Sequence, residues 1–169
     1  MGSTRLPGKI LMEIEGKPML HHELDRLSLS KLIDHVVVAT GDGPENDPVE
    51  TLCESLGVHS FRGSENDVLE RYAKCAEKYP EYDAILRITG DNPLIDPYVI
   101  DELIEHFDGS GSEYASNVEP HQFLYPDGTD CEIFTRDMLM RAQKEATTEY
   151  EREHVTVFME QSEDVKKSF

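Results

Sequence analysis

Small, polar and basic residues gather at the start of the chain, in the stretch MGSTRLPGK. Gly2, Ser3 and Thr4 would let successive backbone N–H groups surround phosphate oxygens, and Arg5 and Lys9 would add positive charge. The stretch is not a Walker loop, because Gly2 lies too far from Lys9 and no hydroxyl residue follows the lysine. It predicts a phosphate-binding loop of another kind, with a basic turn as the alternative.

A second residue that could take part in a reaction is Asp91, in the stretch RITGDNPLIDP. It follows Gly90 at the end of an expected strand and stands two residues before Pro93, so its carboxylate should project away from any helix. Mg²⁺ prefers oxygen ligands and is commonly held by one or two carboxylates together with substrate phosphates. From position alone, however, a turn-forming aspartate is the favoured interpretation.

The elements that would hold these residues alternate along the chain between short apolar strands and helices with 3.6-residue spacing. Strands are expected over 35–40, 58–63, 83–91 and 113–118, and within 123–134. Helices are expected over 18–29, 47–57, 66–79, 96–107, 136–146 and 150–161. This alternation predicts an α/β fold, with a mostly parallel sheet covered by helices on both faces.

Three polar stretches lie at or next to the expected carboxyl ends of strands, at 40–42, 63–67 and 89–92. Open parallel sheets bind their ligands outside the carboxyl ends of the strands, where the strand order reverses. We therefore expect these stretches to meet in one crevice, which the opening loop would join if a strand preceded it.

Composition limits the class of protein. The 169 residues are enough for one domain with a sizeable core, and 35 acidic against 16 basic residues give a net charge of −19. Such a charge disfavours nucleic acid and anionic membranes as partners. No apolar run approaches the length of about 20 residues that a membrane span needs, so a cytoplasmic protein is expected. Cys53, Cys75 and Cys131 are widely spaced and are interpreted as free thiols.

The motifs taken together resemble one family. MGSTRLPGK, EGKPML, GSENDVLERY, RITGDNPLIDP, YPDGTDCEIF and EREHVT are similar to the cytidylyltransferases of surface-polysaccharide synthesis, from residue 1 to about 157. The spore-coat polysaccharide branch is the most similar, and it is related to the synthetases of CMP-Kdo and CMP-sialic acids. The resemblance implies a glycosyltransferase-A-like nucleotidyltransferase fold, CTP as donor and Mg²⁺ as cofactor. It also implies a sugar or sugar-phosphate acceptor. We expect a homodimer, and the region near 123–134 is where a non-catalytic member of this fold would dimerise.

The same resemblance assigns roles by position. Residues implied to bind the nucleotide are Gly2, Ser3, Thr4, Arg5, Lys9, Gly63, Ser64, Asp67 and Arg87. Arg5, Lys9 and Asp91 would be catalytic, with Asp91 on the metal. Residues implied to face the acceptor are Asp127, Asp130, Glu132, Arg152 and His154. Side chains two residues apart on one helix point in directions about 200° apart. Arg152 and His154 would therefore not share a pocket if one helix includes both.

The chain also departs from the family pattern. The family's buried first strand and the arginine after it have no counterpart before residue 1, and an aspartate for a second metal contact is missing after residue 169. We therefore expect a single domain over 1–169 that is shortened at both ends and binds nucleotide poorly. A non-catalytic dimeric binding module is the alternative. A nucleotide-sugar glycosyltransferase ranks third, because no Asp-x-Asp triplet occurs.

Overall fold

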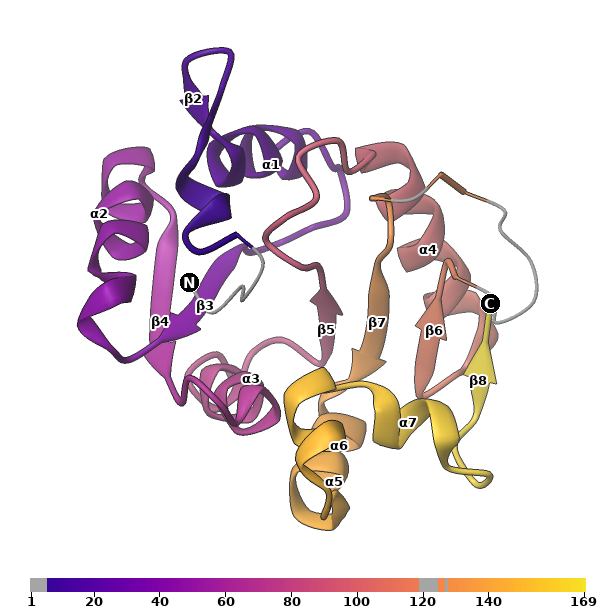
Figure 1. Cartoon of the computed structure of the whole chain (residues 1–169). Coiled ribbons are helices and arrows are strands. Elements are labelled where there is room, and N and C mark those ends of the chain that lie inside the picture. The colour runs from indigo at the N-terminus through magenta and orange to yellow at the C-terminus, as the bar shows by residue number, and fades with distance from the viewer. Residues whose placement is uncertain (1–5, 119–124, 127) are drawn as a thin grey trace.

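The computed structural model describes residues 6–118, 125–126 and 128–169, in which helices and strands alternate (Figure 1). The strands are β1 (Glu13–Ile14), β2 (Lys17–Pro18), β3 (Val37–Gly41), β4 (His59–Gly63), β5 (Ala84–Arg87), β6 (Tyr114–Ser116), β7 (Glu132–Thr135) and β8 (Lys167–Ser168). The helices are α1 (Met19–Leu27), α2 (Asp47–Leu56), α3 (Val68–Glu77), α4 (Pro97–Ser110), α5 (Arg136–Glu145), α6 (Glu149–His154) and α7 (Val157–Gln161). Two short 3-10 turns are η1 (Lys9–Leu11) and η2 (Pro44–Asn46).

The longer strands belong to two separate sheets, one with the order β5–β7–β6–β8 and the other formed by β3 and β4. β7 runs antiparallel to both of its neighbours, whereas β6 and β8 are parallel, so β7 alone reverses direction in the larger sheet. β3 and β4 are also parallel. The α/β fold with a mostly parallel sheet is thus confirmed, and the reversal at β7 is a feature that the sequence did not indicate.

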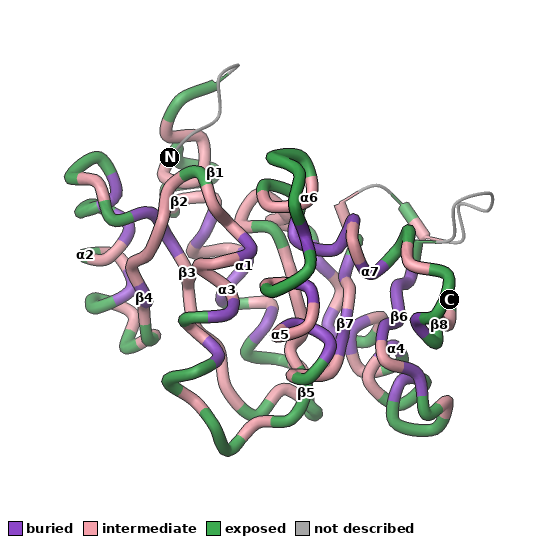
Figure 2. The backbone as a smooth tube through the Cα atoms, turned by 90° about the horizontal axis from the view of Figure 1, so that it is seen from below, coloured by how far each residue is buried: buried purple, intermediate pink, exposed green. Residues whose placement is uncertain are grey.

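A cavity of about 1390 Å³ separates the two sheets, and it is lined by β3 on one side and β5 on the other. Within the described residues, no strand pairs with both of them. Residues 37–39 of β3 are consequently only half-buried, although the sequence predicts a strand buried on both faces, while β6 is buried over its whole length (Figure 2).

Helices cover both faces of the larger sheet. Successive residues of a strand point to opposite sides of the sheet, so neighbouring residues pack into different cores. Ala115 of β6 and Ile133 of β7 pack into a core with the apolar faces of α1, α2 and α4. Their neighbours Tyr114 and Phe134 pack into a second core with α3, α5 and α7. The expected layers are therefore present.

Several helix boundaries follow the sequence rules. The Asp67 side chain accepts a hydrogen bond from the Glu70 amide at 2.9 Å and begins α3, and Asp96 does the same for α4 through Tyr98. Gly57 ends α2 with φ of 68°, a left-handed conformation that costs glycine little.

The prediction of one helix over 150–161 is wrong, because the helix is broken at Val155. This residue has φ of 56° and separates α6 from α7, yet its side chain is fully buried in the second core. A β-branched residue in this region is strained, and the burial of its side chain offsets the strain. Tyr79, also expected on a helix, lies beyond α3, which ends at Glu77.

The strand expected over 83–91 is shorter than predicted. β5 ends at Arg87 because its pairing partner β7 begins at Glu132, directly opposite. The chain then turns, with the Asp91 amide donating to the Thr89 carbonyl at 2.7 Å. Asp91 therefore stands on a turn past the strand end, as its neighbours Gly90 and Pro93 suggested.

Composition predicted that the chain has no membrane span and that its cysteines are free thiols. None of the helices in the described residues is both long enough and apolar enough to cross a membrane. Cys53, Cys75 and Cys131 are free cysteines. Burial raises the pKa of Cys75 to about 11 and that of Cys131 to about 12, so neither thiol is a reactive thiolate at neutral pH.

Candidate active site at the carboxyl end of β5

The structure brings together the two residues that the sequence singles out most strongly. Lys9, which opens η1 after the left-handed Gly8, forms an ion pair with Asp91 on the turn after β5. Their positions in the sequence are 82 residues apart. About a third of each side chain is exposed, so a ligand can reach both groups.

The Asp91 carboxyl is poised to carry a negative charge. Partial burial opposes its ionisation, but hydrogen bonds from Lys9 and Thr89 outweigh that effect and hold the pKa of Asp91 below its usual value. Asp91 is therefore a carboxylate at neutral pH. It offers oxygen ligands to a cation, and Lys9 offers a positive charge beside it.

A buried acid that the sequence analysis missed lies next to this pair. Glu23 of α1 is 3% exposed, and its Oε2 accepts a hydrogen bond from the Asn92 amide at 3.0 Å. Burial raises the pKa of Glu23 to about 7, with Asp91 adding to the rise. Its position three residues after Leu20 and one before Leu24 puts it on the apolar face of the helix, which is the clue that could have revealed it.

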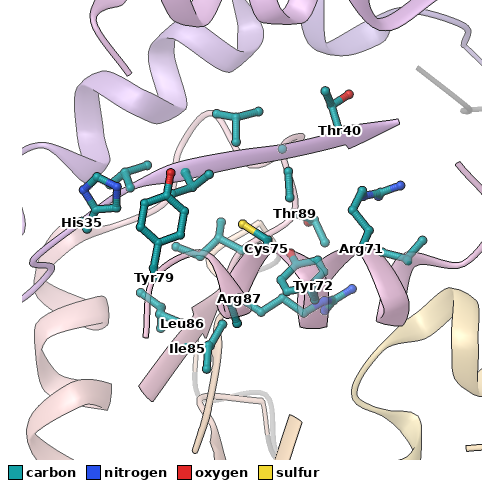
Figure 3. A pocket seen from close by; sticks show the side chains of 18 of the residues that line it. His35, Thr40, Arg71, Tyr72, Cys75, Tyr79, Ile85, Leu86, Arg87 and Thr89 are labelled. Carbon is teal, nitrogen blue, oxygen red and sulfur yellow. The ribbon is translucent and has the colours of Figure 1, made fainter. Parts of the chain in front are cut away.

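The three polar stretches do meet. The cavity between β3 and β5 is lined by residues from all of them, namely Thr40, Gly41, Glu65, Asn66, Asp67, Thr89 and Gly90. In Figure 3, Thr40 and Arg71 lie at one end of the cavity, and His35 and Tyr79 lie toward the other. The meeting of the three stretches in one cavity is confirmed, although β5 stops before the polar turn, and residues 1–5 of the opening loop lie outside the described residues.

Glycine is required where β3 ends. A Cβ on Gly41 would lie 1.6 Å from a carboxylate oxygen of Glu65, so no larger residue fits unless Glu65 moves. Glu65 is held there by the Asn46 amide at 2.9 Å, and Asn46 in turn accepts a hydrogen bond from Thr40 at 3.0 Å. This network fixes the polar rim of the cavity on the β3 side.

Three residues that were expected to bind the nucleotide, Gly63, Ser64 and Asp67, lie at the end of β4 and in the loop that follows it. The Ser64 hydroxyl accepts a hydrogen bond from the Asp67 amide at 3.0 Å, and Asp67 caps α3. A Cβ on Gly63 would come within 3.0 Å of the Arg71 side chain. Asp67 thus lies on the rim of the cavity, where Ser64 holds its amide, and Gly63 lets the Arg71 side chain pack close to the end of β4.

Arg71 belongs to the GSENDVLERY motif, but the sequence analysis gave this arginine no role of its own. It lines the cavity and donates through Nη1 to the Ser64 carbonyl at 2.6 Å. Its buried Nε has no hydrogen-bond partner among the described residues. Burial lowers the pKa of Arg71, and a buried N–H of a cation without a partner favours an anionic or carbonyl ligand.

Arg87 and Glu132, expected at the nucleotide and the acceptor respectively, pair with each other across β5 and β7. Tyr114 donates a hydrogen bond to the second Glu132 oxygen at 2.8 Å. Both charges are mostly buried and neutralise one another. Arg87 nevertheless lines the cavity, and its buried Nε lacks a partner within the described part of the chain.

The two residues from EREHVT point to different surroundings, as their spacing predicted. Arg152 reaches Asp67 with an Nε–Oδ2 distance of 2.6 Å and ties α6 to α3. His154 is exposed and packs against the Tyr150 ring at 4.4 Å. The structure therefore brings Arg152, but not His154, to the rim of the cavity.

The remaining predicted residues are placed as follows. Asp130 is exposed after the turn that precedes β7. Gly2, Ser3, Thr4, Arg5 and Asp127 lie outside the described residues. In the described ranges no group of three or more His, Cys, Asp or Glu side chains could hold a metal by itself. A single carboxylate such as Asp91 still suits Mg²⁺ when substrate phosphates complete the shell.

Comparison with known proteins identifies the family. A cytidylyltransferase family model matches residues 1–166. The chain belongs to the cytidylyltransferase family. A solved cytidylyltransferase from Leptospira borgpetersenii is 38% identical to it with a TM-score of 0.91, covering 99% of this chain and 70% of that one.

Two curated relatives match most of this cytidylyltransferase-family chain, but the match covers only part of each relative's own length. The spore coat polysaccharide biosynthesis protein SpsF of Bacillus subtilis is 35% identical over 94% of this chain and 66% of its own. The mitochondrial 3-deoxy-manno-octulosonate cytidylyltransferase of Arabidopsis thaliana is 32% identical over 79% of this chain and 47% of its own. The chain thus spans about half to two thirds of the length of these relatives.

Proposed function

We propose that this protein transfers CMP from CTP to a sugar or sugar phosphate and releases pyrophosphate, in the synthesis of a surface polysaccharide. The observation that carries the proposal is the ion pair of Lys9 and Asp91, which joins the end of the predicted phosphate-binding loop to the turn after β5. Membership of the cytidylyltransferase family and the sugar-linked names of the relatives support the donor and the acceptor class.

In the proposed reaction, an acceptor oxygen attacks the α-phosphorus in line and the bond to the pyrophosphate oxygen breaks. The protein's main tasks are to position the two substrates and to balance charge. Lys9 turns from Asp91 to the triphosphate and stabilises the charge that gathers on the leaving pyrophosphate. Arg5 would add to this charge. A phosphate acceptor needs no base, whereas a hydroxyl acceptor must lose a proton.

Asp91 would hold Mg²⁺ together with phosphate oxygens of CTP, and the ion would neutralise charge on the transferred group. The lowered pKa of Asp91 fits this role, because a metal ligand must be ionised. When Lys9 moves to the triphosphate, the Asp91 oxygen that it occupies becomes available. The proposal also includes a cytoplasmic homodimer formed near 123–134, with Asp130 and Arg152 on the acceptor side.

The test is a pyrophosphate-release assay with CTP, Mg²⁺ and a panel of acceptors: Kdo, a sialic acid and several sugar 1-phosphates. Lys9→Ala and Asp91→Asn should each lower kcat/KM by about 100-fold or more, because each removes charge stabilisation of the transition state. Asp137→Asn, which changes an exposed aspartate on α5, serves as the matched control and should leave the rate unchanged.

Release of pyrophosphate that depends on neither Lys9 nor Asp91 would contradict the proposal. CTP binding without turnover on any acceptor would instead favour the alternative of a non-catalytic dimeric binding module. The two results are told apart by measuring binding and release on the same preparations.

A further inference from the structure

One face of α1 contacts both ends of the turn that follows Asp91. The Glu23 Oε2 accepts a hydrogen bond from the Asn92 amide at 3.0 Å, and the Arg26 Nε donates to the Ile95 carbonyl. The turn itself is closed by the Ile95 amide, which donates to the Asn92 carbonyl at 3.0 Å. Glu23 and Arg26 are three residues apart and so lie on the same side of the helix. Figure 1 shows the segment between β5 and α4 passing α1.

The same helix also supports the other half of the ion pair. The Met19 amide, at the start of α1, donates to the Met12 carbonyl at 2.9 Å, and the Met12 amide donates to the Lys9 carbonyl at 3.0 Å. Apolar residues of η1 pack against the core that contains the buried face of α1. Lys9 and Asp91 therefore come from distant segments of the chain but are both anchored to α1.

The glutamate on this helix face is not explained by packing. Glu23 is 3% exposed, and its neighbours Leu20 and Leu24 belong to the apolar core. Burying a carboxyl among such residues costs free energy, which an apolar side chain would avoid. An apolar side chain would, however, leave the Asn92 amide without its acceptor. The turn, and not the core, accounts for the type of residue at this position.

We propose that Glu23 and Arg26 form a clamp, the α1 clamp, which positions the Asp91 carboxylate beside Lys9 for Mg²⁺ and CTP. The inference rests on the proposed function and names two positioning residues for it. Glu23 holds the first amide of the turn and Arg26 holds its last carbonyl, so the loss of either contact frees the turn. Residues that orient a metal ligand in this way affect metal affinity without touching the ion.

The first test measures how CTP binding depends on Mg²⁺, by calorimetric titration of CTP at a series of Mg²⁺ concentrations. Glu23→Met removes the acceptor and Arg26→Met removes the donor. Each should raise the Mg²⁺ concentration that gives half-maximal CTP binding by about tenfold or more. Glu23→Gln keeps an acceptor oxygen and should leave this concentration nearly unchanged. Glu54→Met, at an exposed position of α2, is the matched control and should not change it either.

This readout separates positioning from a role in folding alone. A variant that is merely less stable has fewer folded molecules, but those molecules still bind at the same Mg²⁺ concentration. Unchanged Mg²⁺ dependence in both methionine variants would therefore overturn the proposal. Equal impairment of Glu23→Gln and Glu23→Met would overturn it as well, because the acceptor oxygen would then not be what matters. If Glu23→Met fails to fold, Arg26→Met, at a half-buried position, still decides the matter.

Native-state hydrogen exchange gives a second readout that needs neither CTP nor Mg²⁺. The amides of Asn92 and Ile95 should exchange about tenfold faster or more in Glu23→Met and Arg26→Met, while those of β7 should not change. Absence of CTP binding in the unchanged protein, together with this faster exchange in the variants, would count against the proposed function. Unchanged exchange of both amides would overturn the α1 clamp, whatever the protein binds.

Discussion

Two carboxyl groups close to the end of β5 have pKa values displaced in opposite directions. Asp91 is partly exposed and receives hydrogen bonds from Lys9 and Thr89, which keep its pKa low against the effect of burial. Glu23 is buried and has one backbone donor, so its pKa rises to about 7. Such divergent pairs are typical of sites that divide roles between two acids. Asp91 is the ionised member and Glu23 is the one that changes charge near neutral pH.

Glu23 makes stability depend on pH. The folded state holds the Glu23 proton up to about pH 7, whereas the unfolded state releases it near 4.5, so the free energy of unfolding falls as pH rises between these values. At about 1.4 kcal/mol per unit of pH, the charged carboxylate costs about 3 kcal/mol above pH 7. Glu23→Gln keeps an acceptor for the Asn92 amide, and it should stabilise the protein at pH 8 but not at pH 4.5.

Urea unfolding at the two pH values measures this difference, with Glu54→Gln as a control at an exposed position. The same change in unfolding free energy at both pH values would show that the Glu23 charge is not the cause. The measurement concerns folding alone and needs no substrate.

At the scale of elements, α3 connects the two halves of the molecule. It packs against β3 and β4 on one side and against α5 and α6 on the other. Its first turn is held by Asp67, which caps the helix and also accepts a hydrogen bond from Arg152 of α6. The nucleotide-binding role expected for Asp67 therefore competes with a structural one that the sequence showed only in part.

Replacement of Asp67 separates these roles. Asp67→Ala loses the cap and the ion pair and should lower the free energy of unfolding by about 2 kcal/mol, while Asp67→Asn keeps the cap and should lose about half of that. A cycle with Arg152→Ala isolates the ion pair. Full stability of Asp67→Ala, together with weakened CTP binding, would assign the residue to the nucleotide instead.

Local rules account for the helix ends that the sequence predicted, but not for the features that tertiary packing and strand pairing decide. Asp67, Asp96 and Gly57 mark helix ends through side-chain or backbone preferences that act within a few residues, so these ends are readable from the sequence. The break at Val155 has no such marker, because a strained φ there is fixed by packing in the second core. The reversal of β7 likewise depends on pairing with β5 and β6.

At the scale of the whole molecule, the contact between Lys9 and Asp91 joins residues 82 positions apart in a chain of 169 residues. The types and positions of Lys9 and Asp91 singled out each residue separately, and the resemblance to a family placed them in one site. Neither local spacing nor composition could predict that the two residues are in contact. The pairing of Arg87 with Glu132 escaped prediction for the same reason, since it depends on the register of β5 against β7. Long-range pairs of charges are set by topology, which a single sequence encodes only through the whole fold.

We propose that Lys9 and Asp91 form a Mg²⁺-dependent site for CTP. Calorimetric titration of CTP, UTP, ATP and GTP, with and without Mg²⁺, tests it most directly on the unchanged protein and on Asp91→Ala. Binding is expected to be weak but selective for CTP, to need Mg²⁺, and to weaken further by about tenfold or more in the variant. Equal binding of all four nucleotides, or CTP binding that is indifferent to Mg²⁺ and to Asp91, would contradict it.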